Sequence, residues 1–173
     1  AEIINADGAK IADSWRIIGK IQPHLSTKAL ITGFTDVTGC LSLFKAALLT
    51  SVLPIPEGVP VHDQWITFCA SLHNGYKSIP DKILQYRIHD GNSIGLGNSY
   101  SWSDRLNINL KWVRAIIHCP IFQLLSPAET SFAFEYEKYL SRRFLKSFQI
   151  TAIPWAWKNR HDLYPHCKTL KDF

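Results

Sequence analysis

The stretch that decides the fold is His62-Asp63-Gln64-Trp65-Ile66-Thr67-Phe68-Cys69-Ala70-Ser71-Leu72, which follows a loop rich in proline and glycine at residues 54–60. Proline fixes φ and has no N–H to donate, so this loop interrupts any regular element before it. Apolar residues then recur at spacings of three and four, which predicts an amphipathic helix that ends near Asn74-Gly75. Asp63 is therefore expected at the start of the helix, next to a histidine and two residues before Trp65.

Asp63 is open to two interpretations. An acid in the first turn of a helix stabilises exposed backbone amides and interacts favourably with the helix dipole. The same acid, with a histidine before it and an indole after it, could instead mark a functional site. The spacing alone leaves both interpretations open.

Two further segments of interest lie on either side of this stretch in the chain. They are Thr38-Gly39-Cys40-Leu41-Ser42-Leu43-Phe44-Lys45 and the residues from Ile83 to Gly95. The first resembles the TGC...FR/K segment of family 2 glycosyltransferases with the GT-A fold. The tetrapeptide at 62–65 resembles their HDxW motif, and the last segment resembles their LxYRxHxxNxxG motif. The three occur in the family's order and at similar intervals, and the rhamnosyltransferase-like branch, which builds bacterial surface polysaccharides, is the most similar.

The resemblance implies an inverting transfer of a sugar from a nucleotide-sugar donor to a hydroxyl of a glycan or a lipid-linked acceptor. Asp63 would be the catalytic base, Trp65 a platform for a sugar ring, and His62 a neighbour that positions the acid. The substrate-binding residues implied are Gly39, Cys40, His62, Trp65, Arg87 and Asn92. His89 would bind a divalent cation, Mg or Mn, at the donor diphosphate.

Other roles for these residues stay open. Gly39 could simply permit a tight turn. His89 could hydrogen-bond to loop backbone. Arg87 could pair with phosphate, or with Asp63 or Asp90.

The fold class expected is α+β, with a partial GT-A-type region of a few short strands over residues 1–100 and a C-terminal helical subdomain over 101–173. Strands are expected at 1–5 and 9–11 around an Asp-Gly turn, and at 76–79 and 82–89. A short helix or turn is expected at 28–34, and an apolar helical stripe at 43–53 is assigned to the core. Longer helices are expected at 102–117, starting at Ser103-Asp104, and at 128–148, with Phe132, Tyr136, Tyr139, Leu140 and Phe144 on one face.

The chain has 173 residues and no methionine, and it has no equivalent of the family's metal-binding D-x-D motif. We therefore expect it to be a piece of a larger protein that lacks the nucleotide-binding half and is inactive, or nearly so, by itself. Four well-separated cysteines without a C-x-x-C pair indicate a reduced, cytoplasmic protein. No apolar run is long enough for a membrane span, and no signal peptide is recognisable.

The net charge of +5 lies in the helical region: residues 101–173 contain eleven Lys/Arg and six Asp/Glu, whereas 1–100 contain eight of each. With Trp155 and Trp157 close to its end, this region could contact the anionic inner face of the cell membrane, or it could be an ordinary solvated surface. Nucleic-acid binding is not expected, because no recognition motif accompanies the charge.

Two other functions compete with the transferase. One is a non-catalytic helical interaction module, in which Asp63 is only a cap. The other is a small metal-dependent hydrolase that uses His62, Asp63 and His89, but the spacing lacks an H-x-H or H-x-x-x-H signature.

Overall fold

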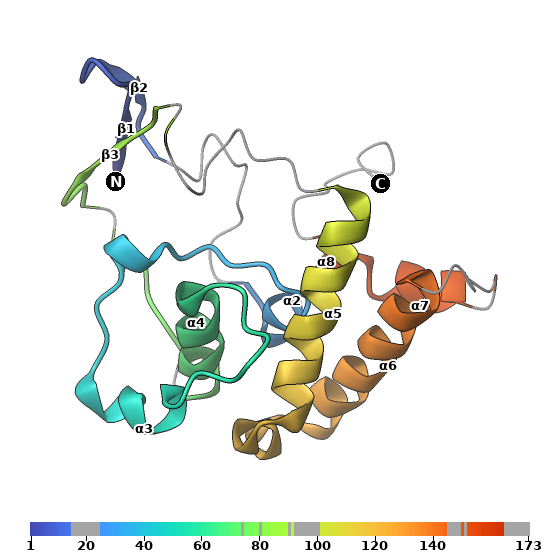
Figure 1. Cartoon of the computed structure of the whole chain (residues 1–173). Coiled ribbons are helices and arrows are strands. Elements are labelled where there is room, and N and C mark those ends of the chain that lie inside the picture. The colour runs from blue at the N-terminus through green and yellow to red at the C-terminus, as the bar shows by residue number, and fades with distance from the viewer. Residues whose placement is uncertain are drawn as a thin grey trace.

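The computed structural model describes residues 1–14, 25–73, 75–79, 81–89, 91, 101–144, 150 and 152–164. It is a mixed α+β structure that is mostly helical, with one three-stranded sheet and seven α-helices among the described residues. The sheet lies at the upper left of Figure 1, and the helices lie below it and to its right. The expected α+β class is confirmed at this level.

The sheet contains β1 (Glu2–Ile4), β2 (Lys10–Ala12) and β3 (Gln85–Arg87) in the order β2-β1-β3. The predicted hairpin is confirmed: β1 and β2 are antiparallel, and Gly8 adopts the φ of 87° that their turn requires. β3 pairs parallel to β1 across more than eighty residues of sequence. The strand predicted at 76–79 is not formed, and the one predicted at 82–89 is reduced to β3.

The central helix is α4 (His62–Leu72), which confirms the element predicted from the 62–72 pattern. Before it come α2 (Thr27–Ile31), three-residue 3₁₀ turns at Gly39–Leu41 and Ala46–Leu48, and α3 (Leu49–Val52). After it come α5 (Trp102–His118), a 3₁₀ turn (Pro120–Leu124), α6 (Pro127–Phe144), α7 (Ala152–Lys158) and α8 (Arg160–Leu163).

Helices α5 and α6 lie side by side (Figure 1), and their boundaries differ slightly from those predicted. α5 begins at Trp102 as predicted, but its N-cap is Ser101 rather than the Ser103-Asp104 pair, because the Ser101 hydroxyl accepts the N–H of Asp104 at 3.1 Å. The described part of α6 ends at Phe144, and residues 145–149 lie outside the described residues. Phe144 is 48% exposed, so its assignment to the buried face was wrong, whereas Tyr136 and the other predicted members of that face are buried.

The core is built around three aromatic rings from two helices. Trp65 and Phe68 of α4 pack edge-to-face against Trp112 of α5, with ring centroids 6.2 and 6.0 Å away. The same cluster of buried side chains continues through α6 to α8, so the regions 25–76 and 102–164 share one hydrophobic core.

The C-terminal end of α2 lies at the centre of this core. The last carbonyls of a helix have no hydrogen-bond donor within the helix. Here side chains from three other helices donate to carbonyls in the last turn of α2 and in the two residues that follow it. The donors are Trp112 Nε1 to the Leu30 carbonyl (3.1 Å), the Tyr136 hydroxyl to Thr32 (3.1 Å) and Gln64 Nε2 to Gly33. These contacts fix α4, α5 and α6 relative to α2.

The segment 43–53 differs from its prediction as core. Of its apolar residues, Val52 is buried, whereas Leu43 is fully exposed and Leu53 is 56% exposed. Two short helical turns cannot bury all sides of the segment. It is anchored by Val52, whose carbonyl accepts a hydrogen bond from Trp65 Nε1 at 2.8 Å.

None of the described helices is both long enough and apolar enough to span a bilayer.

Candidate functional site

The turn at Gly39–Leu41 contacts the start of α4, and so brings together the first two segments singled out in the sequence. The N–H of Gly39 donates to Asp63 Oδ2 at 3.2 Å. A Cβ placed on Gly39 would lie 2.7 Å from Nε2 of His62, closer than such atoms normally approach. The absence of a side chain at residue 39 therefore allows His62 and Asp63 to lie directly against this turn.

Asp63 is half-buried in the first turn of α4. Its Oδ1 accepts the N–H of Gln64 at 2.7 Å, while Oδ2 accepts from Gly39. A carboxylate has about four acceptor positions on its two oxygens, so these two bonds leave room for a further donor. The structural role of a first-turn acid is thus present, and it leaves acceptor capacity for a ligand hydroxyl.

The other residues expected around Asp63 have different environments. Cys40 lies within the 39–41 turn and His62 lies beside it, and both are exposed. Trp65 is only 1% exposed, and its ring is enclosed by Phe68 and Trp112. The interpretation of Trp65 as a platform for a sugar ring does not fit this position, because neither ring face is open to a ligand. The apolar period that predicted α4 already placed Trp65 on the buried face, and this signal outweighs the motif.

Arg87 and His89 make local contacts with backbone. Arg87 Nη1 donates to the carbonyls of Asn5 (3.3 Å) and Ala6 (2.6 Å), which ties β3 to the β1–β2 turn. His89 is exposed, and its Nδ1 accepts the N–H of Gly91 at 3.1 Å. The structure therefore shows a loop-backbone role for His89. Asn92, expected to bind substrate, lies outside the described residues, as does Asp90.

No metal cluster is formed in the part of the chain that the structure describes: no three His, Cys, Asp or Glu side chains converge there. The Mg or Mn ion implied by the resemblance is expected to take most of its ligands from the nucleotide-binding half, which this chain is expected to lack, so its binding stays a prediction. His89 in particular is not joined by two further ligands.

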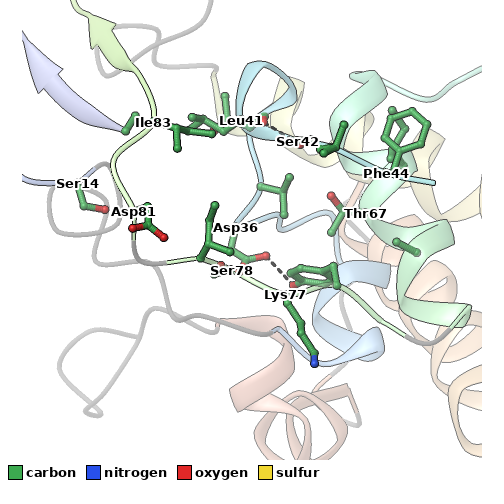
Figure 2. A pocket seen from close by; sticks show the side chains of 18 of the residues that line it. Ser14, Asp36, Leu41, Ser42, Phe44, Thr67, Lys77, Ser78, Asp81 and Ile83 are labelled. Carbon is green, nitrogen blue, oxygen red and sulfur yellow. Dashed lines mark hydrogen bonds between the residues drawn. The ribbon is translucent and has the colours of Figure 1, made fainter. Parts of the chain in front are cut away.

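A cavity of about 460 Å³ opens between one face of α4 and the segments 36–44, 76–79 and 81–83 (Figure 2). Thr67 extends into it from α4, one helical turn after Asp63. Asp63 itself is not among the residues that line the cavity, but Thr38, which precedes the Gly39 contact, is. The cavity thus reaches α4 one helical turn after Asp63 and shares the supporting elements of that residue.

Two of the cavity's polar residues were missed in the sequence. The hydroxyl of Tyr76 donates to Asp36 Oδ1 at 2.6 Å across the cavity wall, as the dashed line in Figure 2 shows. Asp36 precedes the first motif and Tyr76 follows the site helix, forty residues later. Neither belongs to a local pattern, so the sequence contained no signal that would have paired them.

An ion-pair network borders the cavity on the side of the sheet. Asp13 binds Lys10 at 2.7 Å and also pairs with Lys82, while Lys10 binds Glu2 at 3.1 Å. Hydrogen bonds from Lys10 and Lys82 lower the pKa of the exposed Asp13 carboxyl to about 2. Asp13 and Lys82 thereby neutralise each other where they line the cavity.

Comparison with known proteins identified no relative: no family model, no curated protein and no solved structure matches the chain. The function therefore has to be argued from the residues and their geometry.

Proposed function

We propose that this chain is the acceptor-side part of an inverting glycosyltransferase that moves a sugar from a nucleotide-sugar donor to a hydroxyl of a glycan or lipid-linked acceptor. The observation that supports this most directly is the contact of Gly39 with His62 and Asp63 beside a cavity of ligand size. Two of the three motif-like segments meet there, although a 24-residue interval separates Gly39 from Asp63. A cluster with only a capping role needs no adjoining cavity.

In the proposed reaction, an acceptor hydroxyl attacks the anomeric carbon of the donor sugar. The bond from that carbon to the diphosphate breaks, and the diphosphate leaves with the bonding electron pair. Asp63 takes the proton of the attacking hydroxyl as the C–O bond forms, which leaves a neutral glycosidic linkage with inverted configuration. One carboxylate is enough for this single displacement.

Trp65 has a positioning role in this proposal. Its Nε1 bond to the Val52 carbonyl and its packing on Trp112 fix the first turns of α4 against the core. The carboxylate of Asp63 is thereby held on a rigid element, as a catalytic group requires. The Mg or Mn ion expected from the family resemblance would assist departure of the diphosphate, but it has no site among the described residues, and the role of Asp63 does not depend on it.

If the acceptor is lipid-linked, the proposal also places the protein at the inner face of the cell membrane. Trp157 on α7 is 45% exposed, and the Arg160 guanidinium lies 4.8 Å from its ring centre. Exposed tryptophan next to a cation is typical of surfaces that meet anionic lipid headgroups. Trp155 instead stacks on Phe132 at 5.7 Å and is partly buried against the core.

The test is Asp63→Asn in the natural gene product that contains this chain, assayed for transfer with a panel of nucleotide sugars. Loss of a general base should lower kcat by about 10²–10⁴-fold, while donor affinity changes little. Asparagine keeps one oxygen, which can accept the N–H of either Gly39 or Gln64, so one of these two bonds is lost. Because one hydrogen bond contributes about 0.5–1.5 kcal/mol, the variant should stay folded. Asp7→Asn, in the exposed β1–β2 turn, is the matched control.

Two results would count against the proposal. Turnover retained in the Asp63→Asn variant would exclude Asp63 as the base. If the natural protein transfers no sugar, and the Asp63→Asn substitution changes only the free energy of unfolding, the non-catalytic interaction module would be favoured.

A further inference from the structure

The cavity beside α4 has the size of a small-molecule site. Its volume of about 460 Å³ lies within the range of roughly 300–1,000 Å³ that ligand pockets occupy. Its walls come from segments that are far apart in the chain, including Thr38 of the first motif and Ile83 at the start of the third. A pocket that touches all three motif-bearing regions is well placed to hold what reacts at Asp63.

The polar groups in this cavity suit hydroxyl donors. Asp36 has a carboxylate, which only accepts hydrogen bonds, and the Tyr76 hydroxyl bound to it can also accept. Thr67 donates its hydroxyl proton to the Asp63 carbonyl at 2.7 Å, so toward the cavity its oxygen acts as an acceptor. Ser42 likewise donates to the Thr38 carbonyl at 2.9 Å. The cavity therefore offers acceptors to a ligand that brings several O–H groups.

The charges in this cavity do not favour anionic ligands. Asp13 and Lys82 compensate each other, and the side chain of Lys77 runs away from the other labelled side chains in Figure 2. Among the described lining side chains, three carboxylates (Asp13, Asp36 and Asp81) are accompanied by two ammonium groups (Lys77 and Lys82). These side chains therefore supply no excess of positive charge for a phosphate or diphosphate group.

Apolar side chains complete the lining. Leu41, Ile66 and Ile83 contribute hydrocarbon surface between the polar groups. A pyranose ring has the same mixed character, with hydroxyls at its edge and C–H groups on its faces. Phosphates and simple cations lack the second of these features.

We propose that this cavity binds a neutral, hydroxyl-rich sugar ring, held by hydrogen bonds to the Asp36–Tyr76 pair and to Thr67. The identification of this ring as the acceptor sugar rests on the function proposed above, because Thr67 lies one helical turn from Asp63 on the same helix. The binding itself needs no transfer reaction.

The experiment is amide chemical-shift mapping on the ¹⁵N-labelled 173-residue chain. The probes are methyl glycosides of glucose, galactose, mannose, rhamnose and N-acetylglucosamine at millimolar concentrations. At least one should cause saturable shifts centred on residues 36–42, Thr67 and 76–79. Inorganic phosphate should cause none there.

Conservative variants then test the contacts. Asp36→Asn and Tyr76→Phe should each weaken binding by about tenfold, since a hydrogen bond to a charged group is lost or altered. Asp7→Asn and Tyr86→Phe, neither of which lines the cavity, are the matched controls and should bind as the parent does. Ala70→Leu adds volume to the cavity wall without removing a polar group, and should also reduce binding. The spectra themselves report whether each variant is folded.

Absence of saturable shifts for every glycoside, shifts centred elsewhere, or equal binding by all folded variants would overturn the inference. The two proposals fail in different ways. If the binding pattern holds and the natural protein transfers no sugar, the sugar site stands and the transferase proposal falls. If transfer occurs and the Asp36→Asn and Tyr76→Phe variants leave the acceptor KM unchanged, the transferase stands and this site falls.

Discussion

The substitution Tyr136→Phe tests whether the C-terminal end of α2 is the point that joins the helices. Tyr136 is 4% exposed, and its hydroxyl donates to the Thr32 carbonyl at 3.1 Å and accepts from Asn109 Nδ2 at 3.4 Å. Its ring stacks on Phe132, with centroids 6.1 Å apart. Phenylalanine keeps the ring and removes only the hydroxyl. Burial raises the pKa of Tyr136, so the parent hydroxyl remains a donor throughout the practical pH range.

The expected cost follows from what the hydroxyl leaves behind. Thr32 is 2% exposed, so water cannot replace the lost donor to its carbonyl. A buried acceptor left without a partner costs about 1–3 kcal/mol. We therefore expect the free energy of unfolding to fall by about 2 kcal/mol and Tm to fall by about 4–8 °C for a chain of this size.

Urea denaturation, followed by tryptophan fluorescence and by far-UV circular dichroism, measures this change. The midpoint should fall while the slope m stays the same, because the surface exposed on unfolding is unaltered. Tyr86→Phe on β3 is the control for loss of a tyrosine hydroxyl outside the helical core. A loss below about 0.5 kcal/mol for Tyr136→Phe, the size of an ordinary surface substitution, would refute the reasoning.

Two further predictions concern the site and its border. Gly39→Ala should displace the His62 ring, because the new Cβ would lie 2.7 Å from Nε2. The exposed ring can move, so we expect a change of less than about 1 kcal/mol in stability but about a tenfold or greater loss of transfer, and equal activity would contradict the role of this contact. Asp13→Asn tests the ion-pair network. Because its lysine partners lower the pKa of Asp13 from 3.8 to about 2, its ion pairs stabilise the fold above pH 4 and are lost as the pH falls toward 2. The variant's stability should therefore depend less on pH between 4 and 2 in acid denaturation, and an unchanged profile would show that the network contributes nothing.

Local patterns predicted the elements that local physics controls. The proline-rich loop followed by an apolar period of three and four residues correctly located α4, with Asp63 in its first turn. The Asp-Gly turn located the β1–β2 hairpin, since Gly8 adopts a left-handed φ there. The range predicted for α5, 102–117, agrees with the structure to one residue, but the capping residue was misassigned, because Ser101 rather than Ser103 accepts the Asp104 N–H.

The surroundings of each element were decided by the tertiary structure. The motif suggested an open indole at Trp65, but packing against Trp112, 47 residues later, buries it. The stripe at 43–53 had a core-like composition, yet most of its apolar side chains are exposed. Burial depends on which distant segments arrive at a surface, and the residues of the segment itself do not contain this information.

By itself the sequence determined where α4, α5, α6 and the β1–β2 hairpin form, because hydrogen bonds and apolar spacing within a few residues select those structures. It also placed Gly39 and the His62-Asp63 pair among the residues of interest. Only the tertiary structure decided that these residues touch, that the Tyr76 hydroxyl bonds to Asp36 forty residues earlier, and that Asp36 and Tyr76 line a cavity beside α4. The physical reason is that such contacts form when the shared core brings α2, α4, α5 and α6 together, which fixes the loops between them at distances that no local pattern encodes.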